Sequence, residues 1–82
     1  NTLRFYMPGN YVLEKETDKK YLSFIGMTPI KKLTLTGVVY PLNGKDYDYP
    51  IALVSNEFEE AEMHFSFESG VLAVIQSADK RK

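Results

Sequence analysis

Residues 62–76 have the sequence EMHFSFESGVLAVIQ, in which apolar and polar side chains alternate on both sides of a Ser-Gly pair. A period of two residues is typical of a β-strand that buries one face. The Ser69-Gly70 pair predicts a tight turn between two strands, and so a hairpin. Its facing pairs would be Phe67 with Leu72, Phe65 with Val74 and Met63 with Gln76. The side chains of His64, Ser66 and Glu68 would then lie on the opposite, polar side.

A second hairpin is predicted around Asn43-Gly44, a dipeptide that suits a type I′ turn. The flanking strands would be residues 31–42 and 45–55. A two-residue turn would place Tyr40 opposite Tyr47 and Tyr49 opposite Val38. One face of this hairpin would therefore be rich in tyrosine.

The same alternation extends through the first third of the chain. Residues 2–7 predict a strand whose buried side chains are Leu3, Phe5 and Met7. Pro8-Gly9-Asn10 predicts a turn, and further strands follow over residues 11–15 and 21–26.

Residues 56–62 are ambiguous. Asn56 followed by Glu59 is the spacing of a capping box, which favours a short helix. A loop fits the same residues equally well.

These patterns predict an all-β fold, a small antiparallel barrel or a compact sandwich of about six or seven strands, with at most one short helix near 56–62. The alternative is an α+β fold, in which that helix covers one antiparallel sheet. Residues 1–79 are expected to form a single domain, and residues 80–82 a basic, frayed end.

The composition is that of an ordinary globular domain without disulfide bonds. The 82 residues include no cysteine, so no disulfide can form. No apolar run reaches the roughly 18–20 residues that span a bilayer, and no signal-peptide pattern opens the chain. We therefore predict a cytoplasmic location and no membrane contact.

Charge is distributed very unevenly along the chain. Between Asp46 and Asp79 there is no lysine or arginine, although the formal net charge of the whole chain is only −1. Typical soluble surfaces intersperse both signs. An acidic face is therefore predicted to bind a partner with a basic surface, although a merely solvated surface would explain the same pattern. Its members are Asp46, Asp48, Glu57, Glu59, Glu60 and Glu62.

The tyrosines of the second predicted hairpin are the other candidate binding surface. Tyrosine is enriched in interface hot spots, because it combines a large area with a polar tip. The candidates are Tyr40, Tyr47 and Tyr49. Cross-strand pairing that only stabilises the hairpin is the alternative interpretation.

Motifs for catalysis, metals and cofactors are absent from the sequence. Residues 43–48 lack the ligand spacing of a calcium loop, and His64 is the single imidazole. There is no phosphate-binding glycine loop and no nucleophile elbow. These absences predict that the chain is not an enzyme, has no catalytic or metal-binding residue, and needs no cofactor.

The resulting hypothesis is a non-enzymatic protein-interaction module, such as an inhibitor, adaptor or accessory protein. One alternative is a self-assembling structural subunit that pairs complementary charges and strand edges, so a homo-oligomer is a second kind of partner. Another is a weak nucleic-acid-binding barrel, which the sequence pI of about 5.8 disfavours.

Overall fold

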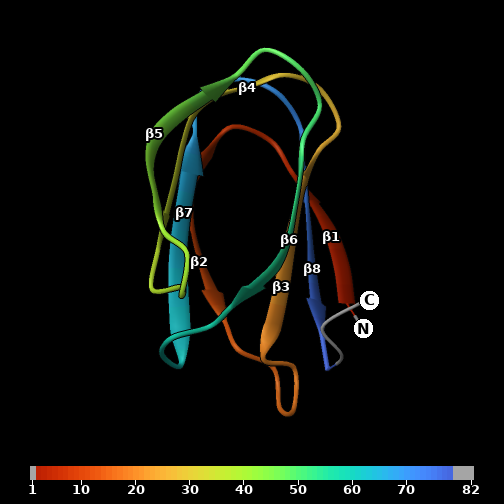
Figure 1. Ribbon diagram of the computed structural model, residues 1–82, viewed down its shortest axis with the longest axis vertical. Helices are drawn as coiled ribbons and strands as arrows, with labels where there is room; N and C mark the ends of the chain where they lie inside the picture. The colour runs from red at the N-terminus through yellow and green to blue at the C-terminus, as the bar shows by residue number, and fades with distance from the viewer. Residues whose placement is uncertain (1, 79–82) are drawn as a thin grey trace.

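A computed structural model describes residues 2–78, which form eight β-strands and no helix (Figure 1). The strands are β1 (Thr2–Tyr6), β2 (Gly9–Glu14), β3 (Tyr21–Gly26), β4 (Ile30–Thr36), β5 (Leu42–Tyr47), β6 (Ala52–Glu57), β7 (Glu62–Phe67) and β8 (Leu72–Ser77). Because no helix forms in this part of the chain, none there could cross a membrane.

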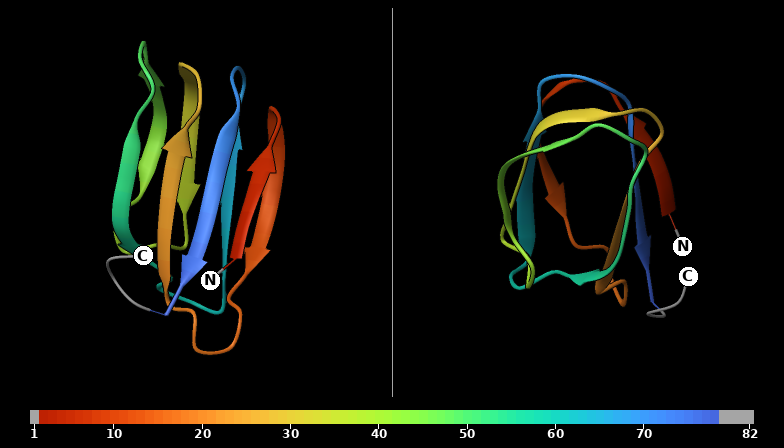
Figure 2. Two further views of the ribbon diagram at one scale, coloured as in Figure 1. Left: turned by 90° about the vertical axis from the view of Figure 1, so that its right-hand side faces the viewer. Right: turned by 45° about the horizontal axis from the view of Figure 1, so that its top comes forward.

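The strands divide between two four-stranded antiparallel sheets that face each other (Figure 2). The β1 sheet has the order β1-β8-β3-β6, and the β2 sheet has the order β2-β7-β4-β5. Only β4 and β5 are both consecutive in the chain and paired with each other, so every other connection crosses between the sheets. This is the topology of an eight-stranded jelly roll.

The predicted all-β sandwich is confirmed, with eight strands rather than six or seven. The α+β alternative and the short helix near 56–62 are wrong. Asn56 and Glu57 end β6, Phe58 is buried and forms a bridge with Val38, and Glu62 begins β7. Burial of the Phe58 ring between the sheets outweighs the weak local preference for a helical turn.

The hairpin predicted at Asn43-Gly44 is wrong, because both residues lie inside β5. The turn that joins β4 to β5 is residues 37–41, which place Leu35 opposite Leu42. Gly44 does adopt the left-handed conformation, with φ at 65°, but it does so within a strand whose pairing register shifts. Positive φ serves a bulge as well as a turn.

The hairpin predicted at Ser69-Gly70 is also wrong in its pairing. β7 pairs with β2 and β4, while β8 pairs with β1 and β3. The burial pattern was nevertheless predicted correctly, because Met63, Phe65 and Phe67 are buried. They face Leu72 and Val74 across the core and not across a ladder. Likewise the predicted turn at Pro8-Gly9-Asn10 leads from β1 into the other sheet, and Gly9 and Asn10 belong to β2.

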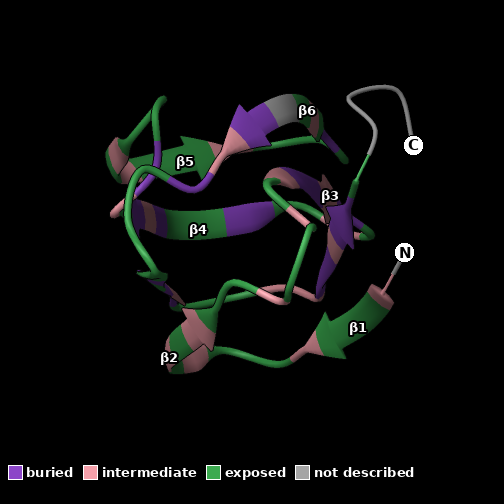
Figure 3. Ribbon diagram, turned by 90° about the horizontal axis from the view of Figure 1, so that it is seen from below, coloured by how far each residue is buried: buried purple, intermediate pink, exposed green. Residues whose placement is uncertain are grey.

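The core lies between the sheets, and burial is least on the edge strand β1 (Figure 3). The predicted inward side of β1 is its outward side, since Leu3 is 53% exposed and Phe5 is 61% exposed. The Tyr6 ring instead packs against the core. Across the β1 sheet, Phe5 is in register with Ala73, Ile25 and Ala52. None of these four residues is charged.

Candidate functional site

The connection between β4 and β5 carries an exposed aromatic side chain on a backbone that is held by hydrogen bonds. We call residues 37–41 the Tyr40 loop. The Tyr40 side chain is 64% exposed, while Val38 in the same loop is buried. The loop is hydrogen-bonded to the end of β6: Val39 N donates to Glu57 O, and Glu59 N donates to Gly37 O, both at 3.0 Å. Backbone hydrogen bonds therefore join two segments that are far apart in sequence.

Asn56 holds the backbone of Tyr40 from inside the protein. Its side chain is buried, with 4% exposure. Asn56 Oδ1 accepts hydrogen bonds from Tyr40 N at 3.1 Å and from Glu57 N at 2.9 Å, and Asn56 Nδ2 donates to Tyr40 O at 3.0 Å. Both backbone polar groups of Tyr40 are thus bound to one amide. Sequence reasoning missed this role, because Asn56 was interpreted as a helix cap.

Gly37 allows the loop to leave β4 at this point. Its φ is 78°, and a Cβ there would lie 2.9 Å from the Glu62 carbonyl oxygen. The left-handed conformation and the close approach of backbone both require glycine.

Several acidic residues lie at the end of the sandwich that carries the Tyr40 loop. Glu57 O and Glu59 N bind the loop, and the carboxylates of Glu59 and Glu60 belong to exposed residues. The Glu57 carboxylate is 3.3 Å from Lys20 Nζ. Members of the predicted acidic face and the predicted tyrosine surface therefore meet here, although the sequence had assigned them to separate surfaces.

The remaining members of the predicted surfaces lie elsewhere. Tyr49 is exposed but follows the far end of β5, and the Tyr47 ring is partly buried against the core. The predicted tyrosine-rich face does not exist, because the hairpin that would have formed it does not form.

Asp46 and Asp48 also lie at the far end of β5, beside two lysines. Asp48 Oδ1 is 3.0 Å from Lys31 Nζ, and this carboxylate raises the pKa of Lys31. Asp46 Oδ1 accepts from Lys32 N at 2.9 Å. The six acidic candidates are thus not one uninterrupted face. Glu62 begins β7 next to Gly37 of the Tyr40 loop, and its carboxylate is 4.0 Å from His64 Nε2.

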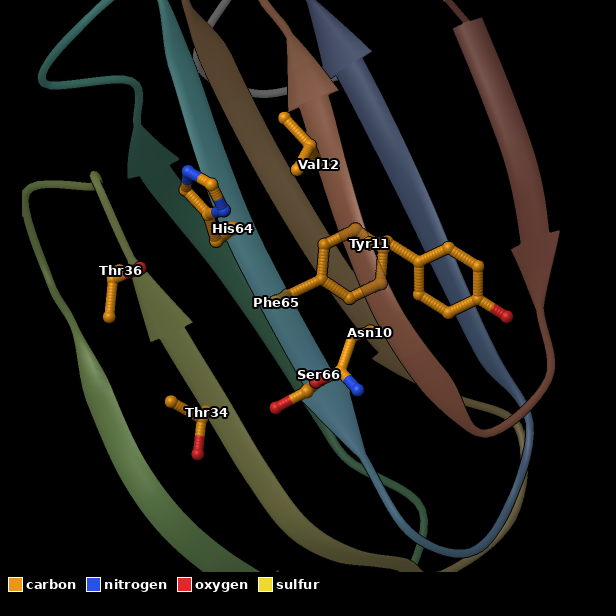
Figure 4. A pocket seen from close by; sticks show the side chains of 8 residues that line it. All are labelled: Asn10, Tyr11, Val12, Thr34, Thr36, His64, Phe65 and Ser66. Atoms are coloured by element: carbon orange, nitrogen blue, oxygen red, sulfur yellow. The ribbon is translucent and has the colours of Figure 1, made fainter.

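A shallow hollow of about 170 Å³ lies on the outer face of the β2 sheet (Figure 4). Its lining comes from β2, β4 and β7. The residues are Asn10, Tyr11, Val12, Thr34, Thr36, His64, Phe65 and Ser66. Ligand sites for molecules of drug size usually have about 300–1,000 Å³, so this hollow is small.

A larger hollow of about 560 Å³ adjoins it and shares Asn10, Thr34 and Ser66. Lys32 lines this second hollow, and its φ of 59° is unusual for a residue with a side chain. The one aromatic residue in its lining, Phe67, is buried. Within residues 2–78, no three histidine or acidic side chains come together in a way that could hold a metal ion.

Comparison with known proteins identifies the family of this chain. The family described as "Thiamin pyrophosphokinase, vitamin B1 binding domain" matches residues 10–72. Thiamine pyrophosphokinase from Bacillus subtilis is 41% identical over 81 residues, which are 96% of this chain and 38% of that protein.

Solved structures agree. A thiamin pyrophosphokinase family protein from Enterococcus faecalis superposes with a TM-score of 0.91 at 46% identity, over 95% of this chain and 37% of that one. For the Geobacillus thermodenitrificans enzyme the TM-score is 0.82 at 30% identity, over 94% of this chain and 37% of that one. The chain thus spans less than two fifths of these relatives.

These matches correct the functional hypothesis drawn from the sequence. The non-enzymatic interaction module is wrong, and so are its self-assembling and nucleic-acid-binding alternatives, because the named relatives are enzymes. The prediction that the chain is not an enzyme is contradicted as well, because the chain is part of an enzyme family. A search for short catalytic motifs cannot detect a domain whose family is defined by a binding function. The chain belongs to the thiamin pyrophosphokinase family, and residues 10–72 match its vitamin B1-binding domain.

Proposed function

We propose that this chain binds thiamine (vitamin B1) at the Tyr40 loop, as the substrate-recognition part of a thiamine pyrophosphokinase. The observation that carries the site is Tyr40 itself, an exposed ring on a backbone held by a buried amide. The substrate comes from the family, whose name is that of an enzyme acting on thiamine. Because the chain spans 38% of the Bacillus subtilis relative, the activity of the whole enzyme is part of the proposal.

The chemistry of thiamine suits this end of the sandwich. Thiamine has two flat heteroaromatic rings, one of which is a permanently cationic thiazolium. The face of a tyrosine ring attracts a cation by about 0.5–1 kcal/mol at an exposed site and by about 2 kcal/mol when water is excluded. Glu59 and Glu60 add negative charge nearby, and the neighbouring Lys20 ammonium is paired with the Glu57 carboxylate at 3.3 Å.

The two hollows on the β2 sheet fit thiamine less well. The first is below the usual size of a ligand site, and the second is lined by one lysine and one glutamate, Lys32 and Glu68, so its charged residues give it no net attraction for a cation. Neither has an exposed aromatic ring in its lining on which a flat ligand could stack.

In this proposal the chain binds and orients thiamine, and other parts of a longer enzyme deliver the pyrophosphoryl group. Residues 2–78 hold no cluster of candidate metal ligands that could position a pyrophosphate donor. Holding one reactant in a fixed orientation contributes to catalysis by itself, since it lowers the entropy lost in the transition state.

Calorimetric titration of the chain with thiamine tests the site. Tyr40→Ala is expected to weaken binding about tenfold, and Tyr40→Phe about twofold or less, because stacking needs the ring and not the hydroxyl. Tyr49→Ala is the matched control, since Tyr49 is equally exposed at the far end of β5. Equal affinities of the Tyr40→Ala and Tyr49→Ala variants would refute the site.

The predicted cytoplasmic location also stays a proposal, which cell fractionation tests. It is supported by the lack of cysteine and of a helix that could cross a membrane within residues 2–78. The predicted protein partner and homo-oligomer stay predictions, and sedimentation analysis of the chain checks the second.

A further inference from the structure

Asn56 lies in β6, but most of its side-chain hydrogen bonds go to the Tyr40 loop. Two of its three side-chain hydrogen bonds go to the backbone of Tyr40, and the third goes to its neighbour Glu57. Leaving a buried amide without partners is costly, so a residue of this kind in an apolar core needs a full set of them. Phe58, which follows two residues later, is buried in the core of the sandwich.

Gln76 on β8 provides an internal comparison. It is buried to the same extent, with 4% exposure. Gln76 Oε1 accepts from Glu16 N at 3.0 Å, and Gln76 Nε2 donates to Glu14 O at 3.2 Å. The fold thus uses two buried amides to hold connections. Gln76 holds two different residues, Glu14 at the end of β2 and Glu16 after it, whereas Asn56 holds both polar groups of the single residue that carries the exposed ring.

We propose that Asn56 is a positioning residue, which fixes the backbone of Tyr40 and so orients the Tyr40 ring for thiamine. The proposal rests on the proposed function, because it names the residue that prepares the same site. Holding the N–H and the C=O of one residue fixes the direction of its Cα–Cβ bond. The ring is then left with only its side-chain torsions to settle when the ligand binds.

A direct contact of Asn56 with the ligand does not fit the structure. Its side chain is buried beneath the loop and has one N–H left beyond its three bonds. Its effect on a ligand at the surface must therefore pass through Tyr40.

The test compares Asn56→Ala with Gln76→Ala. Both variants should lose thermal stability to a similar extent, because each removes a buried, hydrogen-bonded amide. Asn56→Ala alone should weaken thiamine binding about tenfold, since the ligand must then order the loop backbone itself. It alone should also speed hydrogen exchange at the Tyr40 amide. The proposal is overturned if Gln76→Ala weakens binding as much, or if exchange at Tyr40 is unchanged.

A double-mutant cycle separates positioning from general destabilisation. In the Tyr40→Ala background, adding Asn56→Ala should have almost no further effect on affinity, because there is no ring left to orient. Additive losses would overturn the proposal. If Asn56→Ala does not fold, Asn56→Asp replaces it: it keeps the acceptor for Tyr40 N but loses the donor to Tyr40 O. If the wild-type chain binds no thiamine, the proposed function fails, and hydrogen exchange at Tyr40 still decides whether Asn56 holds the loop.

Discussion

The Tyr6 ring lies edge-on against the Phe65 ring, with the ring centroids 5.0 Å apart. Tyr6 also contacts the Tyr11 ring at 4.8 Å, so the edge strand β1 joins an aromatic cluster from β2 and β7. Burial raises the pKa of the Tyr6 hydroxyl. The Tyr6 side chain therefore faces inward, and its apolar neighbour Phe5 faces outward.

This reversal predicts which aromatic residue of β1 stabilises the fold. Tyr6→Ala should lower the free energy of unfolding by about 2–3 kcal/mol, because it removes aromatic contacts and buried area. Phe5→Ala should lower it by less than about 1 kcal/mol, since Phe5 is 61% exposed. Urea denaturation of the two variants measures both values. A larger loss for Phe5→Ala than for Tyr6→Ala would mean that the Phe5 side chain faces the core, as the sequence alone predicts.

Most strands of this fold were predictable from the sequence, but β5 and the pairing of the strands were not. Alternation in residues 62–67 and 72–77 identified the buried side chains, because each strand of a sandwich buries one face. The same alternation is produced whether Phe65 packs across a hairpin or across the core. That choice depends on which strands, far apart in sequence, pair with one another, and a single sequence does not show this pairing.

The candidate site was predictable only in pieces. Tyr40 and Glu59 were singled out for their aromatic and acidic character, and the fold brings their segments together. Asn56 was interpreted as a helix cap, because asparagine binds nearby backbone groups in caps and turns alike. Its partner is Tyr40, 16 residues away. A contact of that range depends on the pairing of the strands.

Gly37 provides a test of the close packing beneath the Tyr40 loop. Gly37→Ala should destabilise the protein by about 2 kcal/mol or more, because the new methyl group would meet the Glu62 carbonyl and positive φ would be strained. Gly44→Ala is the matched control: its φ is also positive, but a Cβ there meets no atom within 4 Å. The cost at Gly44 should be about 1 kcal/mol, from backbone strain alone. Thermal denaturation distinguishes them, and equal costs would contradict the close approach at Gly37.

Glu16 should contribute to the acid sensitivity of the fold. Hydrogen bonds from Lys19 Nζ at 2.9 Å and Thr2 Oγ1 at 2.7 Å lower the pKa of the Glu16 carboxyl. A carboxyl whose pKa is lowered in the folded state stabilises the protein above its unfolded pKa. That contribution is lost as the pH falls through the folded value. An NMR titration should show Glu16 ionising below the ordinary range of glutamate. Glu16→Gln should flatten the fall in melting temperature on acidification, and an unaltered fall would refute the linkage.

If the proposed site is correct, acidic side chains near the two ends of β5 should affect thiamine binding differently. The double variant Glu59→Gln and Glu60→Gln should weaken thiamine binding about two- to threefold, because it removes negative charge beside the Tyr40 loop. The loss should shrink as salt is added, since screening weakens attraction between exposed charges. Asp46→Asn with Asp48→Asn removes the same charge at the far end, where Lys31 and Lys32 already interact with those carboxylates. That control should leave affinity unchanged. Equal effects of the two double variants would mean that thiamine responds to net charge alone and would remove the electrostatic argument for the Tyr40 loop.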